Sequence, residues 1–146
     1  AYNVRNTELG AVIGLSQLKK INYNIKKRNE NFLYFLKNLD KKIFMTNFDL
    51  NGISNYGLIL ILNPDYKSKV NKLMNLMNKN SIEFRRGTAG GGNQLRQPYL
   101  KNKYKKNYFK KFKNTEYVHF YGFYLGNYPD LTKKNIKKIC NIVNGI

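Results

Sequence analysis

The fold is decided by residues 7–40, "TELGAVIGLSQLKKINYNIKKRNENFLYFLKNLD". Thr7 is a typical N-cap, and Glu8 places a negative charge in the first turn, where the helix dipole favours it. Apolar residues then recur at spacings of three, four or seven, with lysine, asparagine and glutamate opposite them. The stretch therefore predicts one long helix with a continuous apolar stripe. The residues of this stripe are Ala11, Leu15, Leu18, Ile25, Phe32, Leu36 and Leu39.

This helix is long for so small a chain. Some thirty residues rising about 1.5 Å each span roughly 45 Å, which exceeds the width of a domain of this size. Its beginning, "LGAVIG" at 9–14, is apolar on most sides and rich in small residues. We expect this beginning to pack on something outside the chain.

The remaining sequence alternates between strand and helix patterns. "YGLILIL" at 56–62 predicts a buried strand, and the following segment predicts a helix whose inner face is Val70, Leu73, Met74 and Met77. "SIEFR" at 81–85 predicts a short strand and "EYVHFYGFYLG" at 116–126 a longer one. A last helix begins near Thr132.

Between these two strand patterns lies a basic segment with aromatic residues, "KYKKNYFKKFKN" at 103–114. It predicts a surface helical turn whose Tyr104, Tyr108 and Phe112 pack inward. The whole order predicts an α+β fold: a three- or four-stranded, mostly antiparallel sheet with helices on one face and the long N-terminal helix projecting from it. Residues 1–40 are expected to form the long interdomain helix and residues 41–146 the α+β small domain.

Composition restricts the class of protein. The net charge of +19 invites a nucleic-acid interpretation, but lysine is scattered over every segment, which favours a solvated coat. No apolar run reaches the roughly 20 residues of a membrane helix. The sole cysteine, Cys140, is expected in the core, and the lack of a disulfide framework indicates a cytoplasmic protein.

Chemistry-bearing residues are few. The sole histidine, His119, is expected mid-strand in a structural role, no catalytic residue is assigned, and no metal-ligand spacing is present. The clearest signal is "RRGTAGGGNQLR" at 85–96, where Arg85, Arg86 and Arg96 bracket a run of glycines. Exposed backbone N–H groups and guanidinium forks together suit an anionic ligand.

Three stretches carry a family resemblance. "YNVRNTELGAVIGLSQLKKI" at 2–21 resembles the opening of the C-terminal small domain in pyridoxal-phosphate-dependent sugar aminotransferases of the DegT/StrS type. "RRGTAGGGNQLRQPYL" and "FYGFYLGNYPDLT" resemble the branch that contains the nucleotide-sugar 3-dehydratases. The matched positions of the first stretch are Tyr2, Asn3, Arg5, Thr7, Glu8, Leu9, Ala11, Gly14, Leu15, Gln17 and Leu18.

The resemblance implies roles for particular residues in a homodimeric fold type I enzyme. Asn3 is implied to reach the phosphate of pyridoxal or pyridoxamine 5'-phosphate, which the absent large domain binds for the most part. Arg5 is implied to shape the substrate pocket. The small-domain side of the nucleotide-sugar site is implied to consist of Arg85, Arg86, Gly90, Gly91, Gly92, Asn93 and Arg96.

The implied reaction uses a 4-keto-6-deoxy nucleotide-sugar in O-antigen or other surface polysaccharide synthesis. Either an amino group passes from glutamate to C4, or the C3 hydroxyl is removed. The chain starts inside a family motif, so we expect a fragment that is inactive alone, its Schiff-base lysine or histidine substitute lying upstream. Two other classes stay open: a small basic RNA-binding module, whose tyrosines and phenylalanines stack bases, and a structural interaction domain that dimerises through the long helix.

Overall fold

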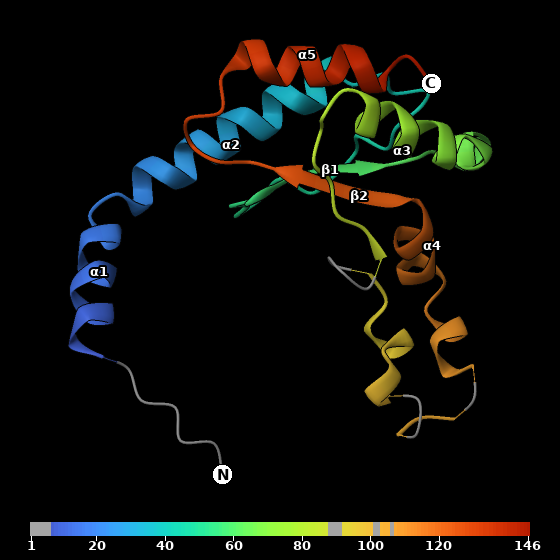
Figure 1. Ribbon diagram of the computed structural model, residues 1–146, viewed down its shortest axis with the longest axis horizontal. Helices are drawn as coiled ribbons and strands as arrows, with labels where there is room; N and C mark the ends of the chain where they lie inside the picture. The colour runs from blue at the N-terminus through green and yellow to red at the C-terminus, as the bar shows by residue number, and fades with distance from the viewer. Residues whose placement is uncertain (1–6, 88–91, 101–102, 106) are drawn as a thin grey trace.

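The computed structural model describes residues 7–87, 92–100, 103–105 and 107–146, and its elements are arranged around a short sheet (Figure 1). The α+β class expected from the sequence is confirmed. In the described part of the middle of the chain, 3₁₀ turns lie at Gln94–Arg96, Pro98–Leu100 and Tyr108–Lys111. The main elements are α1 (Glu8–Leu18), α2 (Ile21–Asn38), β1 (Gly57–Ile61), a 3₁₀ helix (Pro64–Lys69), α3 (Val70–Lys79), α4 (Lys113–Tyr121), β2 (Gly122–Gly126) and α5 (Lys133–Val143).

The sheet has two full strands in the described part of the chain. β1 and β2 pair antiparallel, from Gly57 opposite Gly126 to Ile61 opposite Gly122. Single bridges extend it on both sides, Phe44 to Leu62 beyond β1 and Arg85 to Tyr124 beyond β2. The segment 81–85, expected as a strand, therefore contributes only the Arg85 bridge, and the sheet is narrower than the three or four strands expected.

The hydrophobic core lies between this sheet and the helices α2, α3 and α5, which occupy one side of it (Figure 1). α5 packs against both α2 and α3. The expected inner face of α3 is confirmed, since Leu73 and Met77 are fully buried and Val70 and Met74 pack against the core. Cys140 is also in the core, where burial raises the pKa of its thiol to about 12 and removes it from ordinary nucleophilic chemistry.

The single long helix expected at residues 7–40 is wrong, because the structure divides it into α1 and α2. The chain turns at Lys19 and Lys20, where the N–H of Lys20 donates to the carbonyl of Gln17 at 3.0 Å. α2 buries Phe32 and Phe35 against the core, whereas α1 buries no residue. Only α2 packs against the core of the domain. The two halves of the apolar stripe therefore need not lie on one helix axis.

The strand expected at 116–126 is wrong in its first half, because residues 113–121 form α4 and only β2 is extended. Strand pairing starts where α4 ends: Gly122 pairs with Ile61, and the carbonyl of Tyr121 accepts from the N–H of Leu62 at 3.1 Å. Before Tyr121, the backbone groups are satisfied within the helix instead of across the sheet. His119, expected mid-strand, therefore lies on a helix.

The aromatic residues of the basic segment do not pack inward as expected. Tyr104 and Phe112 are exposed, and they contact Tyr108 from either side at ring-centroid distances of 5.4 and 5.7 Å. The helical turn itself is present at Tyr108–Lys111. No helix among the described residues combines the length and hydropathy needed to cross a membrane.

Candidate functional site

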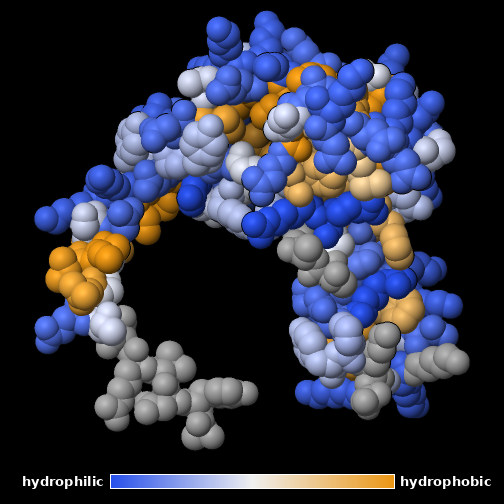
Figure 2. Space-filling model, in the orientation of Figure 1, coloured by the Kyte–Doolittle hydropathy of each residue, from blue (hydrophilic) through white to orange (hydrophobic). Residues whose placement is uncertain are grey.

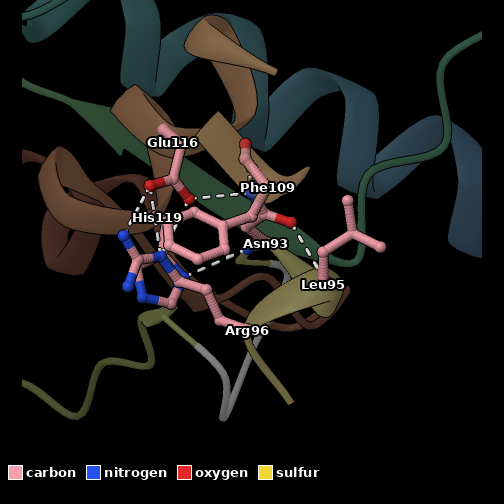
Figure 3. Close-up of polar contacts among 6 residues, drawn as sticks. All are labelled: Asn93, Leu95, Arg96, Phe109, Glu116 and His119. Atoms are coloured by element: carbon pink, nitrogen blue, oxygen red, sulfur yellow. Dashed lines mark hydrogen bonds and ion pairs between the residues drawn. The ribbon is translucent and has the colours of Figure 1, made fainter. Parts of the chain in front are cut away.

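α4 and the 3₁₀ turn Gln94–Arg96 lie on the side of the sheet away from α5 (Figure 1), and polar side chains from the two meet there (Figure 3). Asn93 is the N-cap of this 3₁₀ turn and Arg96 its last residue, and Glu116 and His119 come from α4. We call these four residues the Asn93–Glu116 cluster. Of the sequence-predicted site residues, Asn93 and Arg96 belong to this cluster.

Arg96 is fixed by an ion pair and by two aromatic rings. Its Nε donates to Glu116 Oε1 at 2.8 Å and its Nη2 donates to Glu116 Oε2 at 2.6 Å. The guanidinium carbon lies 4.2 Å from the ring centroid of Phe109 and 4.7 Å from that of Phe120. These cation–π contacts and the fork geometry define both the plane and the direction of the guanidinium.

Glu116 also holds Asn93. The Asn93 amide donates to Glu116 Oε1 at 2.7 Å, and its carbonyl oxygen accepts from the N–H of Leu95 at 3.1 Å (Figure 3). Asn93 is 2% exposed, so its polar atoms depend on these partners. The hydrogen bond from Arg96 lowers the pKa of the Glu116 carboxyl, and burial opposes that effect. Glu116 is therefore a carboxylate at neutral pH.

The glycine-rich segment is closed at its base. The N–H of Gly92 donates to the carbonyl of Gly87 at 2.8 Å, and Gly87 has φ +57°, which favours glycine. A Cβ on Gly92 would lie 2.4 Å from the Gly87 oxygen and 2.5 Å from His119 Nδ1. Only glycine fits at position 92, because the backbone of Gly87 and the ring of His119 lie too close for any side chain.

His119 supports that base as a hydrogen-bond acceptor. Its Nδ1 accepts from the N–H of Asn93 at 3.1 Å, which requires a ring without a proton on Nδ1. Burial lowers the pKa of His119, and Arg96 and Arg86 lower it further, while Glu116 raises it. The expected structural role of His119 agrees with this contact.

Arg86 contacts the C-terminal end of α4. Its Nη2 donates to the carbonyl of Phe120 at 2.6 Å, its Nη1 lies 2.9 Å from the sulfur of Met74, and its guanidinium carbon lies 5.1 Å from the ring centroid of Phe123. A cation at the C-terminal carbonyls of a helix is favoured by the helix dipole. Arg86 therefore has a local task in holding α4 beside β2.

Arg85 lies at the edge of the sheet instead. Its backbone exchanges two 3.0 Å hydrogen bonds with Tyr124. It lines a shallow hollow of about 280 Å³, and the other lining residues are Tyr56, Glu83, Phe84, Tyr124 and Gly126. A hydrogen bond with Tyr124 raises the pKa of Tyr56 in this hollow. Arg85 is thus separate from the Asn93–Glu116 cluster.

The late "GNYP" motif at 126–129 ties the domain together. Asn127 donates from its amide to the carbonyls of Arg28 and Asn55 at 3.0 and 2.8 Å. Asn31 donates in turn to the carbonyl of Tyr128 at 3.2 Å. These bonds link α2, the loop before β1 and the end of β2, so the motif has a structural function.

The remaining predicted site residues, Asn3, Arg5, Gly90 and Gly91, lie outside the described residues. Sequence reasoning missed Glu116. A signal was available, because Glu116 is the sole carboxylate between Glu83 and Asp130 in a strongly basic stretch. An isolated acid among many cations is a candidate partner for one of them.

Comparison with known proteins agrees with this fold. A model of the DegT/DnrJ/EryC1/StrS aminotransferase family matches residues 1–144. The chain is 27% identical over 148 residues to GDP-4-keto-6-deoxy-D-mannose 3-dehydratase of Yersinia pseudotuberculosis, covering 97% of this chain and 36% of that protein. The chain thus spans about a third of the length of this relative.

Solved structures give the same result. The E. coli GDP-4-keto-6-deoxy-D-mannose-3-dehydratase with bound hydrated PLP superposes with a TM-score of 0.84 at 26% identity, over 98% of this chain and 36% of that one. PseC, a Helicobacter pylori aminotransferase of pseudaminic acid biosynthesis, gives 0.78 at 17% identity over 98% and 38% and shows the likeness of fold alone. The fold matches the C-terminal domain of a PLP aminotransferase-fold enzyme, and the expected resemblance is confirmed.

Proposed function

The chain belongs to the DegT/DnrJ/EryC1/StrS aminotransferase family, and we propose that it is the C-terminal small domain of a PLP-dependent enzyme acting on a 4-keto-6-deoxy nucleotide-sugar. The observation that carries the proposal is the match over 98% of the chain, with a TM-score of 0.85, to a GDP-4-keto-6-deoxymannose-3-dehydratase holding a trapped PLP-glutamate geminal diamine. That likeness favours dehydration at C3 over amino transfer to C4. Both reactions need the same cofactor.

The described residues do not form a complete cofactor site. Arg86 and Arg96 donate within the domain, and Cys140 is a buried thiol. Asn3, assigned to the cofactor phosphate by resemblance, lies outside the described residues. We therefore propose that PLP, or its pyridoxamine form, is held mainly by polypeptide beyond this chain. When bound, PLP supplies an electron sink.

For the substrate, we propose that this chain provides one wall of the nucleotide-sugar site. GDP-perosamine is bound in one solved relative that superposes with a TM-score of 0.76 at 25% identity. Gly92, Asn93 and Arg96 stand together at the base of the glycine-rich segment, which supports a site there for an oxyanion. The proposed wall also includes Arg5, Arg85, Arg86, Gly90 and Gly91.

The proposal extends to assembly. The apolar residues on the outside of α1, among them Leu9, Val12 and Ile13, are exposed (Figure 2). Such a face suits burial against a large domain or a second subunit, so we propose a homodimer in which residues 1–40 include the interdomain segment and residues 41–146 form the small domain. α2 nevertheless buries Asn31, Phe32, Phe35 and Leu36 in the small domain, whereas α1 buries no residue.

The wider setting belongs to the same proposal. Glutamate is the proposed amino donor, since PLP-glutamate was trapped in a solved relative. The free thiol of Cys140 is compatible with a cytoplasmic location. Surface polysaccharide or O-antigen synthesis is the proposed use of the product.

The test uses the full-length enzyme that carries this chain. We expect it to purify with a PLP absorption band and, given glutamate and GDP-4-keto-6-deoxymannose, to release a sugar without its C3 hydroxyl or with an amino group at C4. Asn3→Ala should weaken PLP retention, whereas Asn22→Ala on α2 should leave it unchanged. Absence of both PLP and turnover, with salt-sensitive binding of single-stranded RNA, would support the RNA-binding alternative instead.

A further inference from the structure

The direction of Arg96 is determined by three contacts that leave one edge of its guanidinium open. A guanidinium has five N–H donors, and Glu116 takes the Nε donor and one Nη2 donor. The opposite edge, formed by Nη1 and the second Nη2 donor, has no hydrogen-bond partner among the described residues. The side chain as a whole is 29% exposed.

An arginine held in this way is preorganised for an oxyanion. Phe109 and Phe120 both lie within cation–π distance of the guanidinium, so it cannot turn away without losing both contacts. Two parallel donors on the free edge match a phosphate or carboxylate. A free arginine side chain loses rotamer entropy on binding, and Arg96 has already been ordered by its own domain.

The same carboxylate holds Asn93. Glu116 accepts from the amide of Asn93, and the backbone N–H of Asn93 donates to His119 beside the contact between Gly87 and Gly92. Loss of Glu116 would release the guanidinium and Asn93 together.

We propose that Glu116 is a positioning residue, which aims the free edge of Arg96 at an oxyanion of the substrate and holds the base of the glycine-rich segment beside it. This inference rests on the proposed function, and the oxyanion has two possible sources: the diphosphate of the nucleotide-sugar or the carboxylate of glutamate. Glu116 acts through Arg96 and Asn93, and it has no contact with reacting atoms.

The experiment measures steady-state kinetics of the full-length holoenzyme carrying Glu116→Gln. This change keeps the size of the side chain but removes its charge, so the fork to Arg96 is broken. We expect the KM of one substrate to rise about tenfold while kcat stays within about twofold, because a binding contact is lost without change to the chemistry. A rise for the nucleotide-sugar alone assigns the diphosphate, and a rise for glutamate alone assigns the carboxylate.

Three further variants separate positioning from general stability. Arg96→Lys keeps the charge but lacks the fork, and we expect a similar rise in KM. Glu116→Gln in the Arg96→Lys background should add little, since both changes remove one interaction. Glu30→Gln is the matched control, because Glu30 makes an exposed ion pair with Lys27 on α2 at 3.2 Å, and it should leave both KM values unchanged.

The outcomes are distinguishable. If the wild-type enzyme turns over and Glu116→Gln leaves both KM values unchanged, the inference is wrong and the proposed function stands. If the two changes are fully additive, Glu116 does not act through Arg96, and the inference is also wrong. If the wild-type enzyme binds no PLP and turns over neither substrate, both fail. Should Glu116→Gln not fold, Phe109→Leu tests the same point by removing one of the two cation–π contacts of Arg96, with an expected rise in KM of about threefold.

Discussion

α1 and α5 have the same length and the same kind of start, yet only α5 belongs to the hydrophobic core. Each has 11 residues, and each begins at a threonine whose hydroxyl accepts from a backbone N–H three residues later, at 3.1 Å in α1 and 3.2 Å in α5. α5 buries Ile136, Cys140 and Val143, whereas α1 buries no residue. Local signals thus decide where a helix begins, and the distribution of apolar residues decides what it packs on.

The difference lies in the faces of the two helices. In α5 the apolar residues form one narrow stripe opposite lysines, so one side has a definite partner in α2 and α3. In α1 the apolar residues occupy most sides, and the described part of the chain offers them no burial. α1 is therefore suited to a partner that surrounds it.

The largest difference in the free energy of unfolding is expected from a matched pair of isoleucine substitutions, one in each helix. Ile136→Ala in α5 should lower the free energy of unfolding by about 2–5 kcal/mol, because it leaves a cavity in the core. Ile13→Ala in α1, at a side chain that is 62% exposed, should change it by less than about 0.5 kcal/mol. Chemical denaturation of the isolated chain measures both. Equal losses would mean that α1 is packed in this chain.

A second pair uses glycines. Gly92→Ala forces a Cβ against the Gly87 carbonyl and His119, and we expect a loss of about 1–3 kcal/mol in the free energy of unfolding. Gly14→Ala in α1 meets open space and should favour the helix by about 0.4–1 kcal/mol. Circular dichroism would show a small gain of helix for Gly14→Ala. A neutral Gly92→Ala would contradict the closed base of the glycine-rich segment.

The N-caps provide a third pair with a smaller effect. Thr132→Ala should reduce the free energy of unfolding by about 1 kcal/mol, because α5 unfolds with the core. Thr7→Ala should fray α1 without changing the global transition. Hydrogen exchange of the α1 and α5 amides separates local from global opening. A global loss from Thr7→Ala would show that α1 is coupled to the domain.

Sequence patterns predicted those elements whose signals are local. The caps at Thr7 and Thr132, the apolar run of β1 and the inner face of α3 all follow from spacing within one segment. The family resemblance was carried by short motifs, the dense one at the start of the chain and those at residues 85–100 and 120–132, and the family model matches residues 1–144.

The sequence-based predictions failed where contacts with residues far away in the sequence determine the local structure. The apolar stripe through residues 7–40 has one period, but only its second half meets the core, so the break at Lys19 and Lys20 could not be read from it. The aromatic-rich segment 116–121 has strand composition, yet it is helical in α4, and the pairing of β2 with β1 begins only at Gly122. The sequence singled out Arg96, but its partner Glu116 lies twenty residues away on α4, beyond the 3₁₀ turns Pro98–Leu100 and Tyr108–Lys111.

α4 buries no residue in the core, unlike α5, but in the described part of the chain its polar side chains bond to the rest of the domain, unlike those of α1. We expect the stability that the His119 hydrogen bond contributes to depend on pH. His119 must be unprotonated on Nδ1 to accept from the N–H of Asn93. Burial lowers the pKa of His119 below 6.5 in the folded state. The charges of Arg96 and Arg86 lower it further, and the carboxylate of Glu116 opposes them. The unfolded chain therefore binds the proton first as pH falls, so stability is full above about 6.5 and declines from there towards the folded pKa. His119 is the only histidine, so His119→Asn, whose side-chain oxygen can still accept from Asn93, should remove this decline. The measurement is the free energy of unfolding at pH 7.5 and 5.5. A decline that persists in His119→Asn would assign it to other groups and would leave α4 attached independently of its histidine.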